Sequence, residues 1–429
     1  MSSLPIGPRR AAIVTAALLV VATACRVERA AGPGDGAAVP RRALTDFEAQ
    51  TVRAANGFAF DLLREVGAER EHRGKNLVLS PYSGAAALGM TLNGAAGATR
   101  AGMQQALGLA GQSVAQANAT FQGLTGYLLG ADPKVTVRTA NSVWAAEGFP
   151  VRPAFTEAVR TYYDAEARTA RFGTAEATRT INAWASEKTA GRIPKVFEDG
   201  EPDGQTVLLL MNALYFKGQW AARFDAARTR PAPFRLDGGA VVSVPTMSRD
   251  ETALRVGFVD GARVGELAYG NGAYAMTIVL PPAGTGVEAY AAALTPARWD
   301  ALVGALREAT LPVTLPKFAL KGESGWNAPL VRLGMADAFD PRRADFSGLS
   351  ERCLPQGPPG RDCHISFVKQ HIDLQVDEEG TVAAAVTAVG VRVTSAPVPF
   401  AVDRPFVFAI RERASGAILF VGRVVDPRG

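Results

Sequence analysis

Few residues of this chain have the types and spacing that enzyme chemistry needs. Ser366 and Lys369 match the Ser-x-x-Lys pattern, in which a lysine activates a serine nucleophile. That chemistry needs the start of a helix, whereas Ser366 lies in an alternating stretch that predicts a strand. The chain also has no Lys-Thr-Gly partner motif. We interpret the match as chance.

Other catalytic signatures are missing from the sequence. It contains no Gly-x-x-x-x-Gly-Lys phosphate loop, no His-Glu-x-x-His and no Gly-x-Ser-x-Gly elbow. Its three histidines are scattered, which gives a Ser-His-Asp triad poor support. We therefore expect a protein that is not an enzyme and that uses neither a metal nor a cofactor.

The composition is that of an ordinary globular protein. The 429 residues are 48% hydrophobic and 20% charged, enough for one large core or two average domains. The formal net charge is +5, and the basic residues form no dense cluster with interleaved aromatic side chains. The sequence therefore gives little support to nucleic-acid binding.

The N-terminus predicts export. Two arginines precede an apolar run over residues 11–24, and Cys25 follows it. The run is too short to span a bilayer comfortably, so residues 1–24 are predicted to be a signal peptide.

Two cleavage rules fit the bond before Cys25. One is the ordinary rule of small residues at a signal-peptide cut, and the other is that of a bacterial lipoprotein acylated on the new N-terminal cysteine. We favour the lipoprotein, because a free exported cysteine at that place would be unusual. Residues 25–45, rich in Ala, Gly, Pro and Arg, then form a tether. We expect the protein in a bacterial cell envelope, held to the membrane by a lipid on Cys25, or secreted.

The remaining cysteines, Cys353 and Cys363, flank a stretch rich in proline and glycine. In an oxidising compartment they are predicted to form a disulfide, which would stabilise the fold by about 2–3 kcal/mol. A zinc site is the alternative, and it would need more ligands than the neighbouring His364 supplies.

Hydrophobic patterns predict a mixed α+β chain without a repeating βαβ rhythm. Ser80 and Pro81 are expected to cap and begin a helix. Other helices are expected over residues 46–73, 151–168, 287–308 and 325–334. The run 207–216 predicts a central strand buried on both faces, with Asn212 as a buried polar group that needs partners.

Residues 365–377 alternate as a strand should, which places Gln370 on the apolar face and His371 on a solvated face. Residues 377–395 follow, with three acids and a glycine ahead of a run of small and β-branched side chains. Taken alone, this stretch fits a helix or an ordinary buried strand, and the rest of the chain must decide.

Nine stretches, in chain order, indicate how residues 377–395 should be interpreted. They are Asn76 with Ser80–Ser83, Gly94–Thr99, Ala140–Trp144, Ile181–Trp184, Asn212–Trp220, Leu315–Phe318, Asp345–Gly348, Glu378–Thr381 with the alanines after it, and Arg404–Phe406. Through them the chain resembles the serpins, a family of serine protease inhibitors. The resemblance implies one α+β domain over residues 46–429, with three β-sheets, about nine helices and an exposed reactive-centre loop at about residues 380–399.

The resemblance also implies suicide inhibition. A target protease attacks the loop as a substrate and forms an acyl-enzyme. The cut loop then inserts as a new strand into the large sheet, dragging the protease along and distorting its active site. The hinge of this movement is expected at Glu378, Glu379, Gly380, Thr381, Ala383, Ala384 and Ala385. A buried cluster is expected from Ser80, Ser83, Asn212, Gln370 and Trp220.

The reactive bond is expected at Thr394–Ser395. By the family's spacing, fourteen residues after Gly380 and eleven residues before Pro405 both lead to Thr394. A threonine there suggests an elastase-like protease, or another enzyme that takes small or β-branched residues. Arg392 is an alternative cut site for a trypsin-like protease.

The residue pattern supports insertion. The odd-numbered residues from 381 to 393 are all uncharged, and the single charge, Arg392, lies on the opposite face. A strand paired on both sides would gain on the order of a dozen hydrogen bonds, or roughly 10 kcal/mol before side-chain burial.

Two departures from the family pattern bear on how efficiently the protein would inhibit a protease. Val386 stands near the hinge where the family prefers a smaller residue, and Gln370 stands where it usually has a histidine. Gln370 can still donate and accept, so we expect a working cluster with an altered pH dependence. The alternative function is a serpin-fold protein that binds partners or is cut without inhibiting. We expect a monomer.

Overall fold

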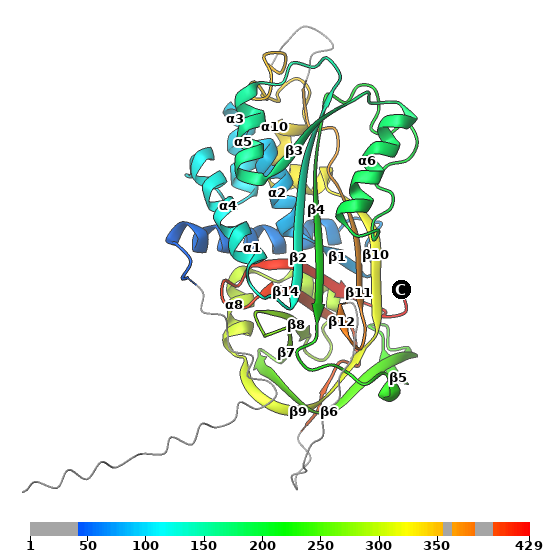
Figure 1. Ribbon diagram of the computed structural model, residues 1–429. Helices are drawn as coiled ribbons and strands as arrows, with labels where there is room; N and C mark the ends of the chain where they lie inside the picture. The colour runs from blue at the N-terminus through cyan, green and yellow to red at the C-terminus, as the bar shows by residue number, and fades with distance from the viewer. Residues whose placement is uncertain (1–41, 355–362, 382–397) are drawn as a thin grey trace, which may run out of the picture. The chain divides into compact units, whose positions relative to one another are not determined.

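The computed structural model describes residues 42–354, 363–381 and 398–429 (Figure 1). Its helical segments are α1 (Asp46–Gly67), α2 (Pro81–Leu92), α3 (Gly97–Ala106), α4 (Val114–Leu129), α5 (Pro153–Tyr163), α6 (Ala175–Lys188), η1 (Ala226–Arg228), α7 (Val287–Ala292), α8 (Pro296–Gly304), α9 (Asn327–Leu330), η2 (Val331–Met335) and α10 (Ala336–Phe339). The last three form one irregular stretch bent at Gly334, where φ is 110°. Counted so, and without the single turn η1, the described residues hold the nine helices expected.

The strands form three sheets. They are β1 (Leu77–Leu79), β2 (Val135–Ala146), β3 (Ala165–Ala170), β4 (Leu208–Gln219), β5 (Arg230–Arg235), β6 (Val241–Val259), β7 (Ala262–Tyr269), β8 (Tyr274–Leu280), β9 (Arg307–Pro316), β10 (Phe318–Gly325), β11 (Lys369–Val376), β12 (Gly380–Thr381), β13 (Phe400–Ala401), β14 (Phe406–Glu412) and β15 (Ile418–Val424). A nine-stranded sheet has the order β1-β15-β14-β8-β7-β6-β9-β13, with β5 on β6. The other two sheets are β12-β4-β2-β3 and β10-β11. The α+β class and the three sheets are confirmed.

Helix ends follow local chemistry. Thr45 and Glu48 form a capping box at the start of α1, and Ser80 accepts the amide of Ser83 at the start of α2, as expected. The helix expected over residues 287–308 is wrong in extent, because Thr295 caps a new helix, α8, that starts at Pro296.

Strand β11 also starts later than expected. Residues 363–368 are not in a strand, and the pairing of β11 with β10 begins at Lys369, opposite Gly325. The amide of Ile365 donates instead to Ala338 and the amide of Val368 to the side chain of Asn327. These bonds tie the segment to α9 and α10 and draw it away from a ladder.

Three groups of buried apolar side chains hold the fold together. The largest lies among α1, α2 and α8, and a second fills the space between the nine-stranded sheet and the long strands β2 and β4. The third is smaller and lies under α6, and it includes Trp184 of α6, Trp144 of β2 and Leu209 of β4. The long strands therefore have the main core on one face and α6 on the other.

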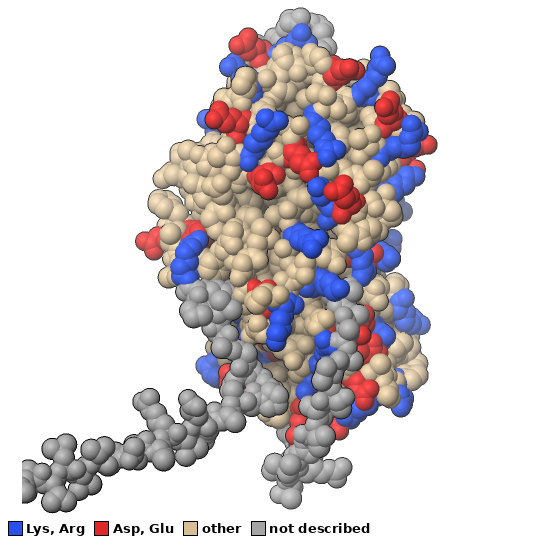
Figure 2. Space-filling model, in the orientation of Figure 1, with Lys and Arg blue, Asp and Glu red and all other residues tan. Residues whose placement is uncertain are grey.

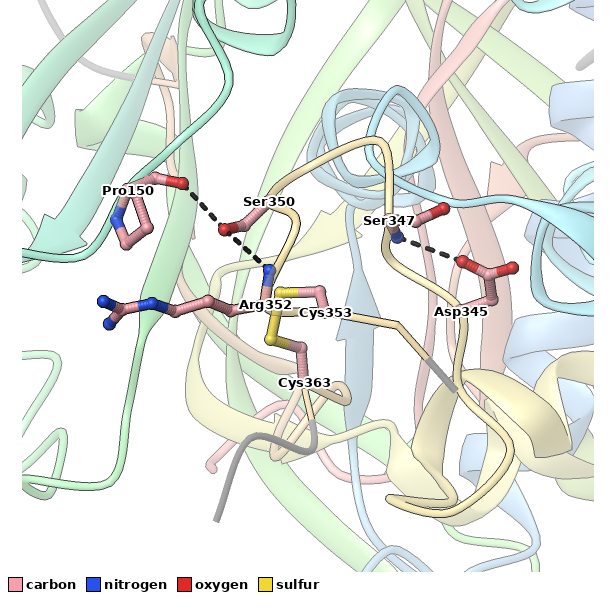
Figure 3. Close-up of a disulfide and its surroundings, with 7 residues drawn as sticks. All are labelled: Pro150, Asp345, Ser347, Ser350, Arg352, Cys353 and Cys363. Atoms are coloured by element: carbon pink, nitrogen blue, oxygen red, sulfur yellow. Dashed lines mark hydrogen bonds between the residues drawn. A yellow bond between two sulfur atoms is a disulfide. The ribbon is translucent and has the colours of Figure 1, made fainter. Parts of the chain in front are cut away.

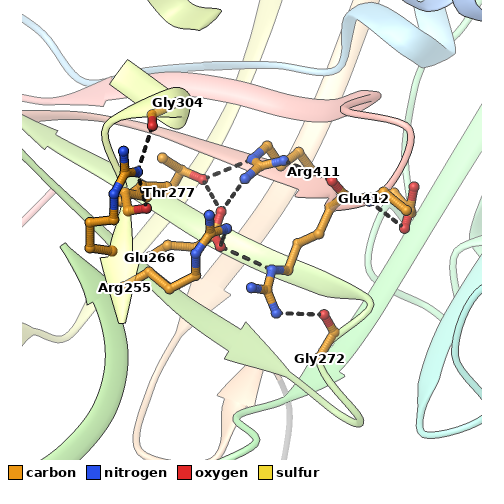
Figure 4. Close-up of polar contacts among 11 residues, drawn as sticks. Arg255, Glu266, Gly272, Thr277, Gly304, Arg411 and Glu412 are labelled. Carbon is orange, nitrogen blue, oxygen red and sulfur yellow. Dashed lines mark hydrogen bonds and ion pairs between the residues drawn. The ribbon is translucent and has the colours of Figure 1, made fainter. Parts of the chain in front are cut away.

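A buried polar network of Arg255, Glu266, Thr277 and Arg411 joins β6, β7, β8 and β14 of the nine-stranded sheet (Figure 4). Glu266 of β7 and Arg411 of β14 form an ion pair whose side chains are only 1% and 2% exposed. The guanidinium groups of Arg255 and Arg413 each lie 3.0 Å from the same carboxylate. Burial alone would raise the pKa of Glu266, but the three arginines outweigh it and hold that pKa below its ordinary value.

Charges on the surface are mixed. On the face drawn in Figure 2, lysine and arginine side chains alternate with aspartate and glutamate and form no basic patch. Among the described residues, no helix is both long and apolar enough to cross a membrane. The same part of the chain contains no group of three or more His, Cys, Asp or Glu that could hold a metal ion.

The network predicts an acid-sensitive fold. Glu266→Gln should destabilise the protein by about 3–5 kcal/mol, because it leaves buried arginines without their counter-charge. Since the folded-state pKa of Glu266 lies below the ordinary 4.5, its contribution is full above pH 4.5 and is lost as the pH falls through the folded value. Melting temperatures of the wild type and the variant between pH 3 and pH 7 should therefore converge in acid. Glu198→Gln, in an exposed pair with Lys195, is the control. An equal loss in both variants at pH 7 would contradict the prediction.

Candidate functional site

The site is a gap between the facing edges of β4, in the four-stranded sheet, and β11, in the two-stranded sheet. No hydrogen bond joins β4 to β11 in the described residues, and the two strands belong to separate sheets. A cavity of about 740 Å³ lies between them and is lined by residues 205–216 and 363–375. Ser80, which caps α2, and Ser83 and Leu88 of α2 form its inner wall, and Trp184 and Ile193 line it from the α6 side.

The prediction that residues 207–216 form a strand buried on both faces is wrong in its burial, because the strand borders the gap. Most residues of β4 are only half-buried, including Asn212, because one edge of the strand borders the cavity. Backbone N–H and C=O groups along such an edge have no partner strand. The edge of β4 therefore offers a ladder that another strand can complete.

The hinge stretch already enters this gap at one end. After β11, Asp377 and Gly380 exchange backbone hydrogen bonds of 3.1 and 3.2 Å, which turns the chain back on itself. Gly380 and Thr381 then pair antiparallel with the end of β4, Gly380 opposite Gln219 and Thr381 opposite Gly218. Strand β12 is thus the first two rungs of a strand placed between β11 and β4.

Gly380 is the residue type that this turn requires. Its φ of +126° is one that side-chain-bearing residues rarely adopt. A Cβ at this position would lie 2.3 Å from the carbonyl oxygen of Gly218 and 2.6 Å from the amide nitrogen of Trp220. Only a glycine lets the hinge lie this close to β4.

Two glutamates fasten the hinge to the chain that follows β4. The amide of Phe224 donates to the carbonyl of Glu378 (3.0 Å), and the amide of Trp220 to that of Glu379 (2.9 Å). The carboxylate of Glu378 accepts from Thr229 (2.7 Å) and pairs with Lys317 (2.8 Å). Burial would raise the pKa of Glu378, but these two partners outweigh it and lower that pKa.

Trp220 lies at the hinge. Its indole N–H donates to the carbonyl of Asp377 (2.9 Å), and its ring stacks on Tyr269 with centroids 4.4 Å apart. This places Trp220 at the entrance to the gap, whereas Ser80 and Gln370 meet further along it.

The expected buried cluster divides into separate contacts. Gln370 is buried and is joined to Ser80 by two bonds: its Oε1 accepts the backbone N–H (2.7 Å), and its Nε2 donates to the backbone carbonyl (2.9 Å). The Ser80 hydroxyl donates to the carbonyl of Leu419 (2.9 Å). On the opposite wall, the Asn212 amide donates to Thr139 and Asn141 of β2 (2.9 and 2.7 Å). The structure thus brings Ser80, Ser83 and Gln370 together, and Asn212 faces them across the cavity.

The environment of His371 differs from the one expected, whereas Ser366 and Lys369 agree with expectation. His371 is half-buried rather than solvated, with Glu323 3.8 Å away, and burial lowers its pKa. Lys369 forms an ion pair with Glu323 (3.2 Å), and the carbonyl of Ser366 accepts from Asn327. Lys369 is therefore engaged elsewhere, which supports chance as the origin of the Ser-x-x-Lys match.

Cys353 and Cys363 are joined by a disulfide at the far end of the gap (Figure 3). Both side chains are buried in the main core, and Cys363 lines the cavity. The chain before Cys353 is held by Ser350, whose hydroxyl donates to the carbonyl of Pro150 (2.7 Å) and accepts the amide of Arg352. The disulfide thus fixes the start of the segment that leads to β11.

Several predicted residues lie outside the described part of the chain. These are Cys25, Ala383, Ala384, Ala385, Val386, Arg392, Thr394 and Ser395. Sequence reasoning missed Thr229, Tyr269 and Lys317 as partners of the hinge. Only Lys317 carried a signal, because it lies in one of the stretches on which the resemblance depends.

Comparisons with known proteins agree with this geometry. The family model described as serpin (serine protease inhibitor) matches residues 53–427. The chain is 35% identical to serpin B8 of Bos taurus over 382 residues, which are 87% of this chain and 98% of that protein. It is 34% identical to the leukocyte elastase inhibitor of Sus scrofa over 395 residues, 88% of this chain and all of the relative.

Among solved structures, the crystal structure of a thermophilic serpin, tengpin, in the native state is similar with a TM-score of 0.78. The two chains are 29% identical, and the match covers 90% of this chain and 96% of tengpin. Together with the matched family model and the relatives above 30% identity, this shows that the chain belongs to the serpin family.

Proposed function

We propose that this protein is a suicide inhibitor of serine proteases, and that the gap between β4 and β11 receives its cut reactive loop. The observation that carries the proposal is β12, two residues already paired with the end of an unpaired strand edge. In the reaction, the protease serine attacks the carbonyl carbon of Thr394, the bond to Ser395 breaks, and an ester to Thr394 forms while Ser395 leaves as an amine.

The register of β12 extends along the whole of β4. Gly380 lies opposite Gln219, and each step forward on the loop is one step back on β4. Residue 391 would then lie opposite Leu208, the first residue of β4, so twelve loop residues match the twelve of the strand. Thr394 would come to rest three residues beyond the end of β4, far from the hinge.

The same register sorts the loop side chains by face. Residues 383 and 385 would lie opposite Phe216 and Leu214, which contact the core between the sheets. The uncharged odd-numbered set thus meets the core, and Arg392 falls on the α6 face. Val386 would lie opposite Ala213, which packs under α6. Its extra bulk therefore meets α6 rather than the main core.

The target is proposed to be an elastase-like protease that accepts threonine before the cut bond. A relative 34% identical to this chain is named leukocyte elastase inhibitor, which supports the choice. A cysteine protease with similar preference and, through Arg392, a trypsin-like protease are the other candidates.

The central prediction is a covalent complex. Incubation with leukocyte elastase should give a species that survives SDS and has the summed mass of the two proteins less the released C-terminal fragment. N-terminal sequencing of that fragment should begin at Ser395. The cut chain, prepared with a protease that is not trapped, should melt at a markedly higher temperature than the intact chain, because insertion completes the ladder. Clean turnover at the bond without a complex, and without a rise in melting temperature, would instead support a binding protein or substrate that does not inhibit.

The hinge gives a second prediction. Gly380→Ala should slow insertion by about tenfold or more, because the added Cβ overlaps β4 and the backbone is strained. More inhibitor should then be cut for each protease trapped, while the first cleavage keeps its rate. Gly111→Ala is a matched control, with a φ of +83° and nothing within 4 Å of the added Cβ. An unchanged stoichiometry in Gly380→Ala, or an equal change in the control, would contradict the hinge role.

Export and anchoring are proposed from the sequence. We infer that the signal peptide is removed before Cys25, that a lipid on this cysteine holds the monomeric inhibitor at a bacterial cell envelope, and that residues 25–45 act as the tether. The test is expression in a bacterial host supplied with labelled palmitate. The wild type should carry the label and appear in the membrane fraction. Cys25→Ser should carry no label and should leave the membrane fraction. Secretion of an unlabelled wild type would show a free exported protein.

A further inference from the structure

The far end of the reactive loop returns to the body at Val398, beside an exposed aromatic side chain. Val398 and Phe258 are 74% and 68% exposed, more than any other large hydrophobic side chain in the described part of the chain. Phe258 is on β6, next to the turn to β7, and lies opposite Arg263 in the β6–β7 ladder. Two large apolar groups thus face solvent in one place.

Arg263 joins these two groups. Its guanidinium lies 5.7 Å from the ring centre of Phe258 and 5.1 Å from that of Phe400. It donates to the carbonyl of Pro399 (2.6 Å) and to that of Val398 (3.3 Å). An arginine can hold two carbonyls and stack on rings at once because its donors are fixed in one plane.

Phe400 fixes this arrangement to the sheet. It is fully buried, and β13 pairs with β9 at Phe400 and Ala401. Its ring occupies the space over Gly265 of β7, where a Cβ would lie 2.3 Å from the ring. The backbone of Val398 is therefore held by a buried ring on one side and by Arg263 on the other.

Chain length places a bound protease over this surface. Val398 follows Ser395 by three positions, which span at most about 10 Å of extended chain. A typical protein–protein interface covers about 800 Å² on each partner, a disc of about 16 Å radius. A protease centred on the reactive bond therefore reaches the side chains of Val398 and Phe258.

We propose that Phe258, Arg263 and Val398 form a docking surface for the target protease on the C-terminal side of the reactive bond. Phe258 and Val398 make the contact, and Arg263 is a positioning residue that holds the loop end against it. The inference rests on the proposed function and adds a determinant of target choice outside the loop. Exposed aromatic and arginine side chains close to the centre of an interface are the types that carry most of its binding energy.

The test uses the full-length protein with leukocyte elastase as the probe. Phe258→Ser should lower the association rate constant by about tenfold, with stoichiometry and melting temperature unchanged. Arg263→Met should also slow association, since it frees the end of the loop. Phe47→Ser is the matched control, because Phe47 is also an exposed phenylalanine (48%) but lies on α1. A residue with a purely structural role would change the melting temperature or the stoichiometry instead.

Each outcome separates this inference from the proposed function. Wild-type rates in both Phe258→Ser and Arg263→Met, or equal slowing by Phe47→Ser, would overturn the docking surface and leave inhibition intact. If elastase cuts the wild type without being trapped, the proposed inhibition fails. In that case, if the docking surface exists, elastase should cleave Phe258→Ser with a lower kcat/KM than the wild type. A wild type that elastase leaves uncut would overturn both.

Discussion

The structure depends on two strand edges that face each other without being paired. Unpaired backbone donors and acceptors inside a folded protein are unfavourable, and a sheet normally closes such a gap. Here β4 and β11 stay apart, with a cavity between them, while the turn at Asp377–Gly380 brings the chain back into the opening. The unpaired edges leave hydrogen bonds that a further strand could form, and under the proposed function the segment after Thr381 would form them.

The rest of the molecule supplies a rigid frame for that opening. The nine-stranded sheet is joined internally by Glu266 and its arginines, and α2 is tied to β11 through Ser80 and Gln370. At one end the hinge is fastened by Lys317, Thr229 and Trp220. At the other end the disulfide holds the chain that leads into β11. Under the proposed function, these contacts would hold the two ends of the gap while the cut loop enters between β4 and β11.

The sequence predicted the elements of this arrangement better than its contacts. Alternation placed Gln370 in the core, and the stretch around Gly380 predicted the hinge, because both depend on neighbours along the chain. Long-range contacts could not be predicted in the same way. The apolar run of β4 indicated burial on both faces, yet its edge borders a cavity that β11 must help to form. Likewise, Arg411 and Arg413 lie more than a hundred residues from Glu266 in the sequence, and nothing in their local sequence indicates that they meet it.

Gln370 has a consequence for where the protein can work. A carboxamide neither gains nor loses a proton across the range in which proteins stay folded, so the tie between α2 and β11 is the same in acidic and in neutral surroundings. Any response of the gap to acidity must therefore come from titratable groups other than this tie, such as His371 beside Gln370 in the cavity lining and Glu378 at the hinge. The contact that joins α2 to β11 keeps its form while those neighbours change charge.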